Sequence, residues 1–341
     1  MIKYFFYILF LSNLLVSAFH HNGQLWIDYN SDNDIESHIA GYIPQFNIKN
    51  KKVEFSYSNK IIIENSDYSN QDYRYWVRYK NNIIDLKIGL QKISFGSAFI
   101  LRNLNWFDSI DFRNTTNQTV GQKALQFKYF SKANYNFNFW FIPDNNDDMS
   151  YGSRAEFSNN FGNYGIVFYK DNTNYNHSII NMPQIINNQN FLIDLLQLKE
   201  NERLGLDYRY DGIFGLWLES TYIKSTNNLN LLNSINFTTI GFDYTVNMYN
   251  GIYLMYELMS YKFKAIDNSF LDGNISSLMI QYPIGILYDL SFIRIFDNQI
   301  KDTYSLIRLI TTYDYFTVNY SYSLNPNEYG DNFQVKLIYN Y

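Results

Sequence analysis

The last ten residues of the chain, 332–341, alternate between apolar and polar side chains. The apolar ones share one face of a predicted strand: Phe333, Val335, Leu337, Tyr339 and Tyr341. Polar residues occupy the other face, on which Ile338 is the single apolar residue. A period of two predicts a β-strand with one apolar and one polar face. Because a terminal strand of this length frays unless both of its edges are paired, two folds suit it. They are a transmembrane barrel that closes on its first strand and a secreted β-sandwich.

The same alternation recurs along the chain from residue 24 onward. In residues 71–79, for example, the apolar parity begins at Tyr73 and the polar parity at Asp72. We count about 18 such strands of ~9–11 residues, which is the length that a tilted strand needs to cross a bilayer. Weak patterns in the N-terminal third leave about 16 strands as the alternative, and either number is even, as in bacterial barrels.

Short and long connections alternate between these strands. The short turns lie near 80–82, 131–133, 159–163, 211–212, 246–251, 283–284 and 313–314. The longer polar loops lie near 96–118, 143–150, 171–201, 225–235, 264–273, 297–302 and 324–331. Bacterial outer-membrane barrels have this asymmetry, with short periplasmic turns and long extracellular loops, and a β-sandwich has no reason for it. We therefore predict an all-β fold, a transmembrane antiparallel β-barrel.

Residues 1–18 are predicted to be a signal peptide. Lys3 supplies a positive charge, residues 4–11 are apolar, and residues 16–18 (V-S-A) fit a signal-peptidase site. Residues 19–341 then form a single barrel domain. No later segment has about 20 consecutive apolar residues, so no transmembrane helix is predicted. An exported chain with this pattern is expected in the bacterial outer membrane.

Composition limits the partners of the chain. Its 341 residues are 19% aromatic, and its formal net charge is -5. A negative net charge without a basic run argues against nucleic acid as a partner. Abundant Tyr and Phe are typical of the aromatic girdles with which barrels contact lipid. The absence of cysteine excludes disulfides and thiolate metal sites, and no other metal or cofactor is predicted.

Residues 89–121 carry the most unusual motif of the chain. Residues 89–96 read G-L-Q-K-I-S-F-G and resemble the G-x-Q-x-I-x-x-G strand end of outer-membrane barrels of the porin, alginate-export and capsule-assembly (Wzi-like) type. Residues 101–113 resemble the loop that follows this strand end. The resemblance implies a closed barrel of about 18 strands with an inward-folded loop. It also implies a role in transport or in handling surface polysaccharide.

The end of the chain carries a second resemblance. Tyr341, with apolar residues two, four and six positions before it, resembles the C-terminal signal by which bacterial barrels are recognised for insertion. The resemblance implies the barrel-assembly machinery as a partner, in addition to outer-membrane lipid. We therefore assign a membrane-insertion signal to the apolar face of the last strand.

The loop at 96–118 is the main candidate for a functional element. Its charged candidates are Arg102, Asp108, Asp111 and Arg113, and its apolar residues are Phe99, Leu101, Leu104, Trp106 and Phe107. A solvent-exposed loop has no need of so many apolar side chains, whereas a loop packed on the inner wall has. Two interpretations stay open. The loop is either a constriction or plug within the lumen, or a cap over the barrel mouth whose charges pair with each other.

The polar parity of the strands is predicted to line the lumen. Its candidates are Arg74, Arg78, Lys87, Arg203, Asp207, Arg209 and Glu219, together with Asp85, Lys128, Arg154, Glu156 and Glu257. Both signs of charge are present, which predicts a mixed interior without strong ion preference. Many of these residues are expected to pair across the wall. Trp140 and Trp217 have the same parity and either stack on a sugar ring or pack in the wall.

The loop at 171–201 is the second candidate. Residues 191–199 have apolar side chains at helical spacing, which is compatible with a short helix in or over the mouth. The alternative is a further strand or an extension of the barrel wall beyond the membrane.

The sequence predicts a channel and no enzymatic activity. The four histidines are His20, His21, His38 and His177, and none is spaced with a serine and an acid as in a hydrolase. We predict a porin-like channel for the passive passage of small polar solutes. The alternative is a non-conducting or plugged barrel that binds or assembles surface polysaccharide.

Overall fold

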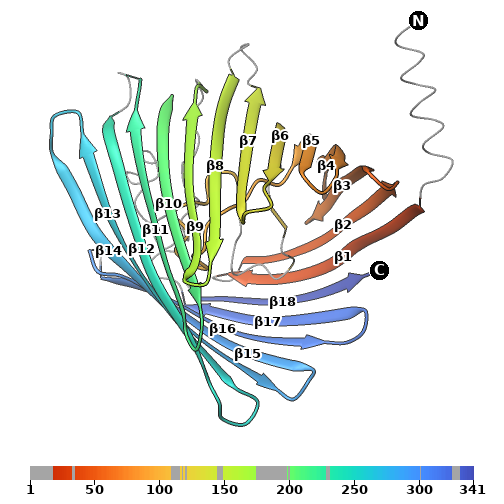
Figure 1. Cartoon of the computed structure of the whole chain (residues 1–341). Helices are drawn as coiled ribbons and strands as arrows, with labels where there is room; N and C mark the ends of the chain where they lie inside the picture. Colours follow the sequence, from red (N-terminus) through yellow and green to blue (C-terminus); the bar gives the residue numbers. More distant parts are fainter. Residues whose placement is uncertain are drawn as a thin grey trace, which may run out of the picture.

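The chain folds into one closed β-barrel (Figure 1). The computed structural model describes residues 18–32, 35–108, 116, 118–119, 121–143, 149–173, 198, 200–227, 231–299, 301–324 and 331–341. The strands are β1 (Ala18–Asp32), β2 (Ile35–Lys49), β3 (Val53–Glu64), β4 (Asp67–Lys80), β5 (Ile84–Gln91), β6 (Gln122–Phe130), β7 (Tyr135–Pro143), β8 (Met149–Asn159), β9 (Gly162–Asp171), β10 (Asn201–Asp211), β11 (Gly215–Ser225), β12 (Leu232–Val246), β13 (Ile252–Ala265), β14 (Phe270–Ile284), β15 (Tyr288–Asp297), β16 (Asp302–Thr312), β17 (Phe316–Leu324) and β18 (Asp331–Asn340).

Every strand is antiparallel to its neighbours, and the first strand closes on the last. β1 pairs with β18 over nine residue pairs, from Gln24 with Asn340 to Asp32 with Asn332. β18 also pairs with β17, so the terminal strand has no free edge. The predicted transmembrane antiparallel barrel and its 18 strands are confirmed, and the alternative of 16 is wrong.

The two rims of the barrel differ in their connections. Short turns and both ends of the described chain lie at one rim, the short-turn rim, and the longer connections lie at the other, the long-loop rim. The asymmetry is carried mainly by the connections 92–121 and 172–200. The longer loops predicted near 264–273 and 297–302 are wrong, because residues 266–269 and 298–301 alone join β13 to β14 and β15 to β16, which is no longer than the turn at 247–251 of the other rim. On the long-loop rim, β1 pairs with β2 as far as Asp32 and Ile35, and Asn65 and Ser66 alone join β3 to β4. Both of these turn residues have positive φ angles, 46° and 85°, as tight hairpins require.

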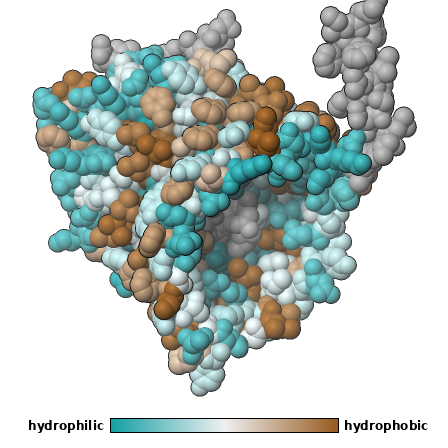
Figure 2. All heavy atoms as spheres, in the orientation of Figure 1, coloured by the Kyte–Doolittle hydropathy of each residue, from teal (hydrophilic) through white to brown (hydrophobic). Residues whose placement is uncertain are grey.

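The outer surface of the barrel is apolar. Outward-facing side chains such as Ile88, Leu206, Ile240, Leu258 and Ile307 are exposed. Figure 2 shows hydrophobic residues spread over the outer wall and a hollow in the barrel. A closed barrel with such a wall leaves no strand edge unpaired in lipid. The protein therefore lies in the bacterial outer membrane, as predicted. Among the described residues, no helix is long and apolar enough to cross a membrane.

The closing strand has the predicted parity. Phe333 and Leu337 are exposed on the outer wall, whereas Lys336 is buried inside. Ile338 packs inside the barrel with Trp26 and Ile43. This small apolar cluster accounts for the one apolar residue on the polar face of the strand.

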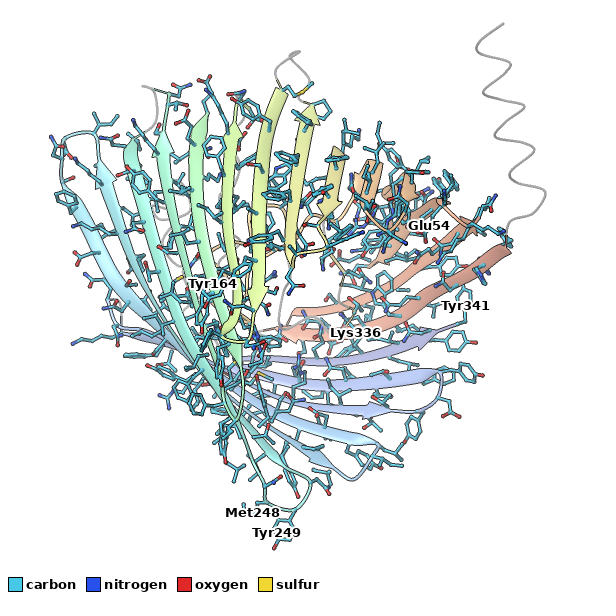
Figure 3. The ribbon with its side chains drawn as sticks, in the orientation of Figure 1. Glu54, Tyr164, Met248, Tyr249, Lys336 and Tyr341 are labelled. Carbon is cyan, nitrogen blue, oxygen red and sulfur yellow. The ribbon has the colours of Figure 1, made fainter. Side chains whose placement is uncertain are left out.

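Tyr341 joins the end of the chain to the first hairpin (Figure 3). Its hydroxyl lies 2.7 Å from the hydroxyl of Tyr42, and its ring contacts the ring of His21. Its backbone pairs with Gly23. These aromatic side chains gather at the short-turn rim, where amphipathic rings suit the boundary between membrane and water.

Replacing Tyr341 with serine is expected to lower the yield of folded barrel. The variant loses the contacts with the first hairpin and the terminal residue of the predicted insertion signal. Tyr249→Ser is the matched control, because Tyr249 is 93% exposed at the tip of the β12–β13 turn (Figure 3). Heat-dependent gel mobility separates folded from unfolded barrel, and equal folded yields from the two variants would contradict the prediction.

One strand departs from the predicted alternation. A register shift opposite Ser58 and Asn59 leaves Tyr73 as an extra residue in β4. The sequence predicts Tyr73 on the outer face, but its hydroxyl accepts a hydrogen bond from the Thr119 backbone inside the barrel. The Arg74 guanidinium lies 4.2 Å from the Tyr73 ring centroid. A β-bulge turns consecutive side chains toward one face, so the prediction for Tyr73 is wrong.

Three tryptophans of the inner wall lie over glycines of the neighbouring strand. The cross-strand pairs are Trp26 with Gly41, Trp140 with Gly152, and Trp217 with Gly241. A Cβ atom on any of these glycines would overlap the indole ring. Each glycine therefore lets an indole lie flat on the wall backbone, and all three tryptophans are buried.

Candidate functional site

The connection between β5 and β6, residues 92–121, is called the lumenal loop, because its described residues lie inside the barrel. Its described residues contact inward-facing side chains of β1, of β4 and of strands from β6 to β13. The described part of the loop therefore packs on the inner wall and does not cap the mouth. Its place within the lumen agrees with the other interpretation, a constriction or plug.

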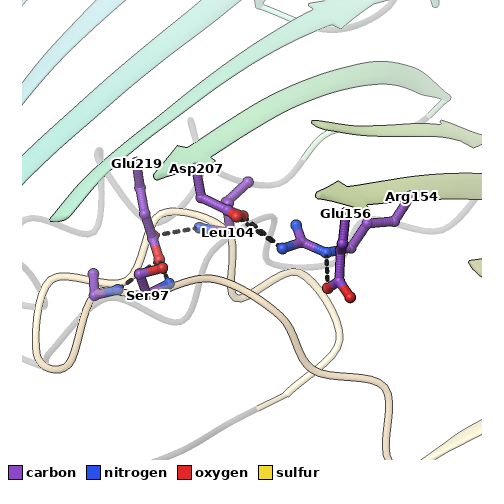
Figure 4. Close-up of polar contacts among 7 residues, drawn as sticks. Ser97, Leu104, Arg154, Glu156, Asp207 and Glu219 are labelled. Atoms are coloured by element: carbon purple, nitrogen blue, oxygen red, sulfur yellow. Dashed lines mark hydrogen bonds and ion pairs between the residues drawn. The ribbon is translucent and has the colours of Figure 1, made fainter. Parts of the chain in front are cut away.

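Glu219 of β11 holds the first part of the lumenal loop (Figure 4). Its buried carboxylate accepts hydrogen bonds from the backbone N–H groups of Ser97, Ala98 (2.7 Å) and Leu104 (3.3 Å). Gly96 precedes them with a φ of 102°, and a Cβ at Gly96 would collide with this carboxylate. Charge-assisted hydrogen bonds of this kind are about twice as strong as neutral ones, so one side chain fixes a sharp turn.

Glu257 of β13 holds the next residues in the same way. Its carboxylate accepts hydrogen bonds from the backbone N–H groups of Phe99 (2.7 Å), Ile100 (2.9 Å) and Leu101 (2.7 Å). The Trp217 indole N–H donates a further bond of 3.0 Å. Glu257 is fully buried, and these donors take the place of the water that a buried carboxylate loses.

Asn103 adds a third connection between the loop and the wall. Its side-chain amide donates to the Glu219 backbone carbonyl and to the Thr239 hydroxyl, each at 3.1 Å. The Thr221 hydroxyl donates to the Asn103 side-chain oxygen at 2.9 Å. The Thr239 hydroxyl donates in turn to the Leu101 carbonyl at 2.8 Å. These bonds satisfy polar groups of the loop that would otherwise be buried without partners.

Apolar contacts surround these hydrogen bonds on both sides. Phe95, Trp106 and Phe107 pack with Trp140 and Tyr169 of the wall, with loop-to-wall ring centroids 4.8–6.3 Å apart. The larger cluster joins three loop residues and Leu198 to the inner wall of strands β11 to β16. Its loop members are Ala98, Ile100 and Leu101. The loop is thus part of the barrel's core, with a buried apolar face toward the wall.

The second part of the lumenal loop reaches the opposite wall. Asp108 is fully buried and lies 3.3 Å from Lys92 at the start of the loop. Arg74 of β4 donates to the carbonyl and the hydroxyl of Thr119, both at 2.7 Å. The Gln118 amide donates to Gln24 of β1 at 3.1 Å. β4 and β13 lie nine strands apart in a ring of 18, so the loop crosses the lumen.

Most of the predicted lumen residues are paired. The pairs are Arg78 with Asp85, Arg154 with Asp207, Arg203 with Asp171, Arg209 with Asp211, and Lys336 with Asp28. Lys87 lies 4.0 Å above the Trp76 ring. Arg102 is half-buried, and its guanidinium donates to the Ser94 hydroxyl at 3.2 Å. Asp111 and Arg113 lie outside the described residues.

Solvent reaches the lumen unevenly. In the half nearest the long-loop rim, the inward side chains of β7 to β16 are mostly buried, as at Ile223 and Ile295. On β18 and β1 to β4 of the same half, inward side chains such as Gln334, Asn30 and Lys60 keep part of their surface exposed. We call these two regions the filled side and the open side of the lumen.

The remaining predicted features are of smaller consequence. Trp140 and Trp217 are almost fully buried, which leaves no face for a sugar ring. Leu198 lies in the apolar cluster of the lumen, and residues 191–197 and 199 lie outside the described residues. His38 contacts the Tyr29 ring at a centroid distance of 5.3 Å. In the described part of the chain, no group of three or more His, Asp or Glu residues could hold a metal ion.

Solved structures with a similar fold are porin-type barrels. The TM-score is 0.60 with Pseudomonas aeruginosa OccK2 (OpdF), 0.58 with Pseudomonas aeruginosa OccD3 (OpdP), and 0.55 with OmpT, an outer membrane protein of Vibrio cholerae. The identities are 9%, 8% and 10%, over 96%, 95% and 95% of this chain and 98%, 91% and 99% of the others. Similarity at this identity concerns the fold alone. No family profile matches the sequence, and no curated protein matches it significantly.

Proposed function

We propose that the protein is an outer-membrane channel through which small polar solutes diffuse, with the lumenal loop as its constriction. The observation that carries the proposal is the path of the loop. It is fixed to the filled side at Glu219 and Glu257 and crosses to β1 and β4, next to partly exposed inward side chains. Such a loop narrows a wide barrel without closing its open side.

Because the loop is fixed to the wall, we favour a permanent constriction rather than a mobile gate. Its backbone N–H groups from residue 97 to residue 101 all donate to buried carboxylates. A loop that opened would leave these donors and both glutamates without partners in the lumen, and each lost bond carries a cost. We therefore expect a steady conductance with few closures.

Planar bilayers containing the purified barrel test the proposal directly. We expect discrete conductance steps. We also expect liposomes that contain the barrel to take up monosaccharides faster than trisaccharides, because the constriction excludes larger solutes. Liposomes without the barrel are the control. Absence of conductance, together with equal exclusion of every sugar, would contradict a channel.

A second candidate function has one observation in its favour. The filled side is closed by the apolar cluster of loop and wall, which includes fully buried residues such as Ile223, Ile235 and Phe237. A barrel closed in this way on all sides would bind or assemble surface polysaccharide without conducting. Binding of a labelled capsular glycan by a barrel that shows no conductance would favour this alternative.

A further inference from the structure

We propose that the constriction prefers small anions, and this inference rests on the proposed channel function. The sequence predicts a mixed interior without strong ion preference. In the described residues, however, the two signs of charge are distributed differently. Carboxylates near the constriction are buried and already paired, whereas several cations keep exposed surface and lack a carboxylate partner.

The carboxylates beside the constriction are neutralised. Asp28 is 4% exposed and accepts from Lys336 at 2.9 Å and from Gln334 at 2.8 Å. Asp108 is fully buried beneath Lys92. On the filled side, Glu219 and Glu257 face the loop backbone and have no exposed surface. None of these four groups presents a negative charge to a passing solute.

The cations at the same place remain exposed in part. Lys60 of β3 is half-buried, lies 5.8 Å above the Trp26 ring, and has no carboxylate within ion-pair distance among the described residues. Arg102 of the lumenal loop donates to the neutral Ser94 hydroxyl. Within the described part of the chain, Arg74 donates to neutral oxygens, those of the Tyr73 and Thr119 carbonyls and of the Thr119 hydroxyl.

Lys92 is the fourth cation, and its side chain is 44% exposed although it pairs with Asp108. The lumen therefore presents Lys60 and Arg74 from the wall of the open side, and Lys92 and Arg102 from the lumenal loop. Because apolar walls focus the field of such charges, a narrow passage lined by one sign concentrates the opposite ion.

The part of the lumen near the short-turn rim carries both signs of charge. Arg78 lies between Glu54 and Asp85, and Asp289 accepts from Gln281. Charges there are separated from a passing ion by water and are screened within about 8–10 Å at physiological salt. The constriction therefore determines the selectivity, and small inorganic or carboxylate anions are the preferred solutes.

The test is the zero-current potential of the wild-type channel across a KCl gradient. We expect chloride to permeate faster than potassium. In the double variant Lys60→Gln, Arg102→Gln the ratio of chloride to potassium permeability should fall toward one. A unit charge about 7 Å from an ion in water changes the occupancy of the constriction by that ion about threefold. The control is Lys224→Gln, because Lys224 is exposed on the outward parity of β11 and its loss should leave the ratio unchanged.

The possible outcomes separate this inference from the proposed function. A conducting wild-type channel that prefers potassium, or that shows no preference, would overturn the anion preference and leave the channel standing. A barrel without conductance would overturn both. If the double variant fails to fold, as judged by heat-dependent gel mobility, the single variant Lys60→Gln provides the same comparison.

Discussion

Replacing Glu219 and Glu257 together with alanine is expected to raise single-channel conductance severalfold and to make it fluctuate. Each substitution removes the acceptor of three backbone N–H groups of the lumenal loop. A buried donor without a partner costs about 1–3 kcal/mol, so each site loses about 3–9 kcal/mol of loop attachment. The loop should leave the wall while the 18-stranded barrel, which has its own hydrogen bonds, stays closed.

The measurement combines conductance with limited proteolysis. In the double variant the lumenal loop should become cleavable, and the barrel should keep its heat-dependent gel mobility. Glu202→Ala is the matched control, because Glu202 lies on the outer face of β10 and pairs with Lys170 at 3.5 Å. An unchanged conductance with a protease-resistant loop would show that these glutamates do not hold the loop.

Replacing Arg154 with methionine is expected to destabilise the folded barrel by about 3–5 kcal/mol, the usual effect of removing one partner of a buried ion pair. One Arg154 guanidinium nitrogen lies 2.7 Å from both oxygens of Asp207, and the two side chains are 8% and 4% exposed (Figure 4). The substitution leaves the Asp207 charge without its partner. The double variant Arg154→Met, Asp207→Leu removes both charges and should recover much of the loss.

Urea unfolding in detergent micelles measures these differences. The control pair is Lys170 and Glu202 on the outer face of β9 and β10, whose side chains are 35% and 39% exposed. Exposed pairs contribute about 0–1 kcal/mol, so Lys170→Met should change the free energy of unfolding little. A loss in Arg154→Met no larger than that in Lys170→Met would contradict the buried-pair argument.

The architecture was predictable because one local rule repeats in every strand. Alternation of apolar and polar residues gives both the strands and their faces, and the contrast in connection length gives the two rims. The rule fails at Tyr73, because Tyr73 and Tyr75 are both aromatic and nothing in their spacing shows that Tyr73 is the extra residue of a bulge. The alternation also does not predict the cross-strand register, which pairs each inner-wall tryptophan with its glycine.

The site was only partly predictable. The many apolar residues of the lumenal loop indicate that it needs a wall to pack on, and Leu101, Leu104, Trp106 and Phe107 are indeed buried. The role of Glu219 and Glu257 had no such signal. Their partners are backbone N–H groups 115 to 158 residues away in the chain, and backbone donors leave no trace in a side-chain pattern.

The pairing of tryptophan with glycine constrains how this lumen can evolve. Adding a side chain to Gly152 while Trp140 is present produces a clash with the indole, whereas losing the indole first produces a cavity that costs about 3–5 kcal/mol. A lineage that widens or reshapes its bore at such a position must therefore lose the tryptophan before it replaces the glycine. Among descendants of this barrel, glycines without their tryptophans should outnumber tryptophans without their glycines.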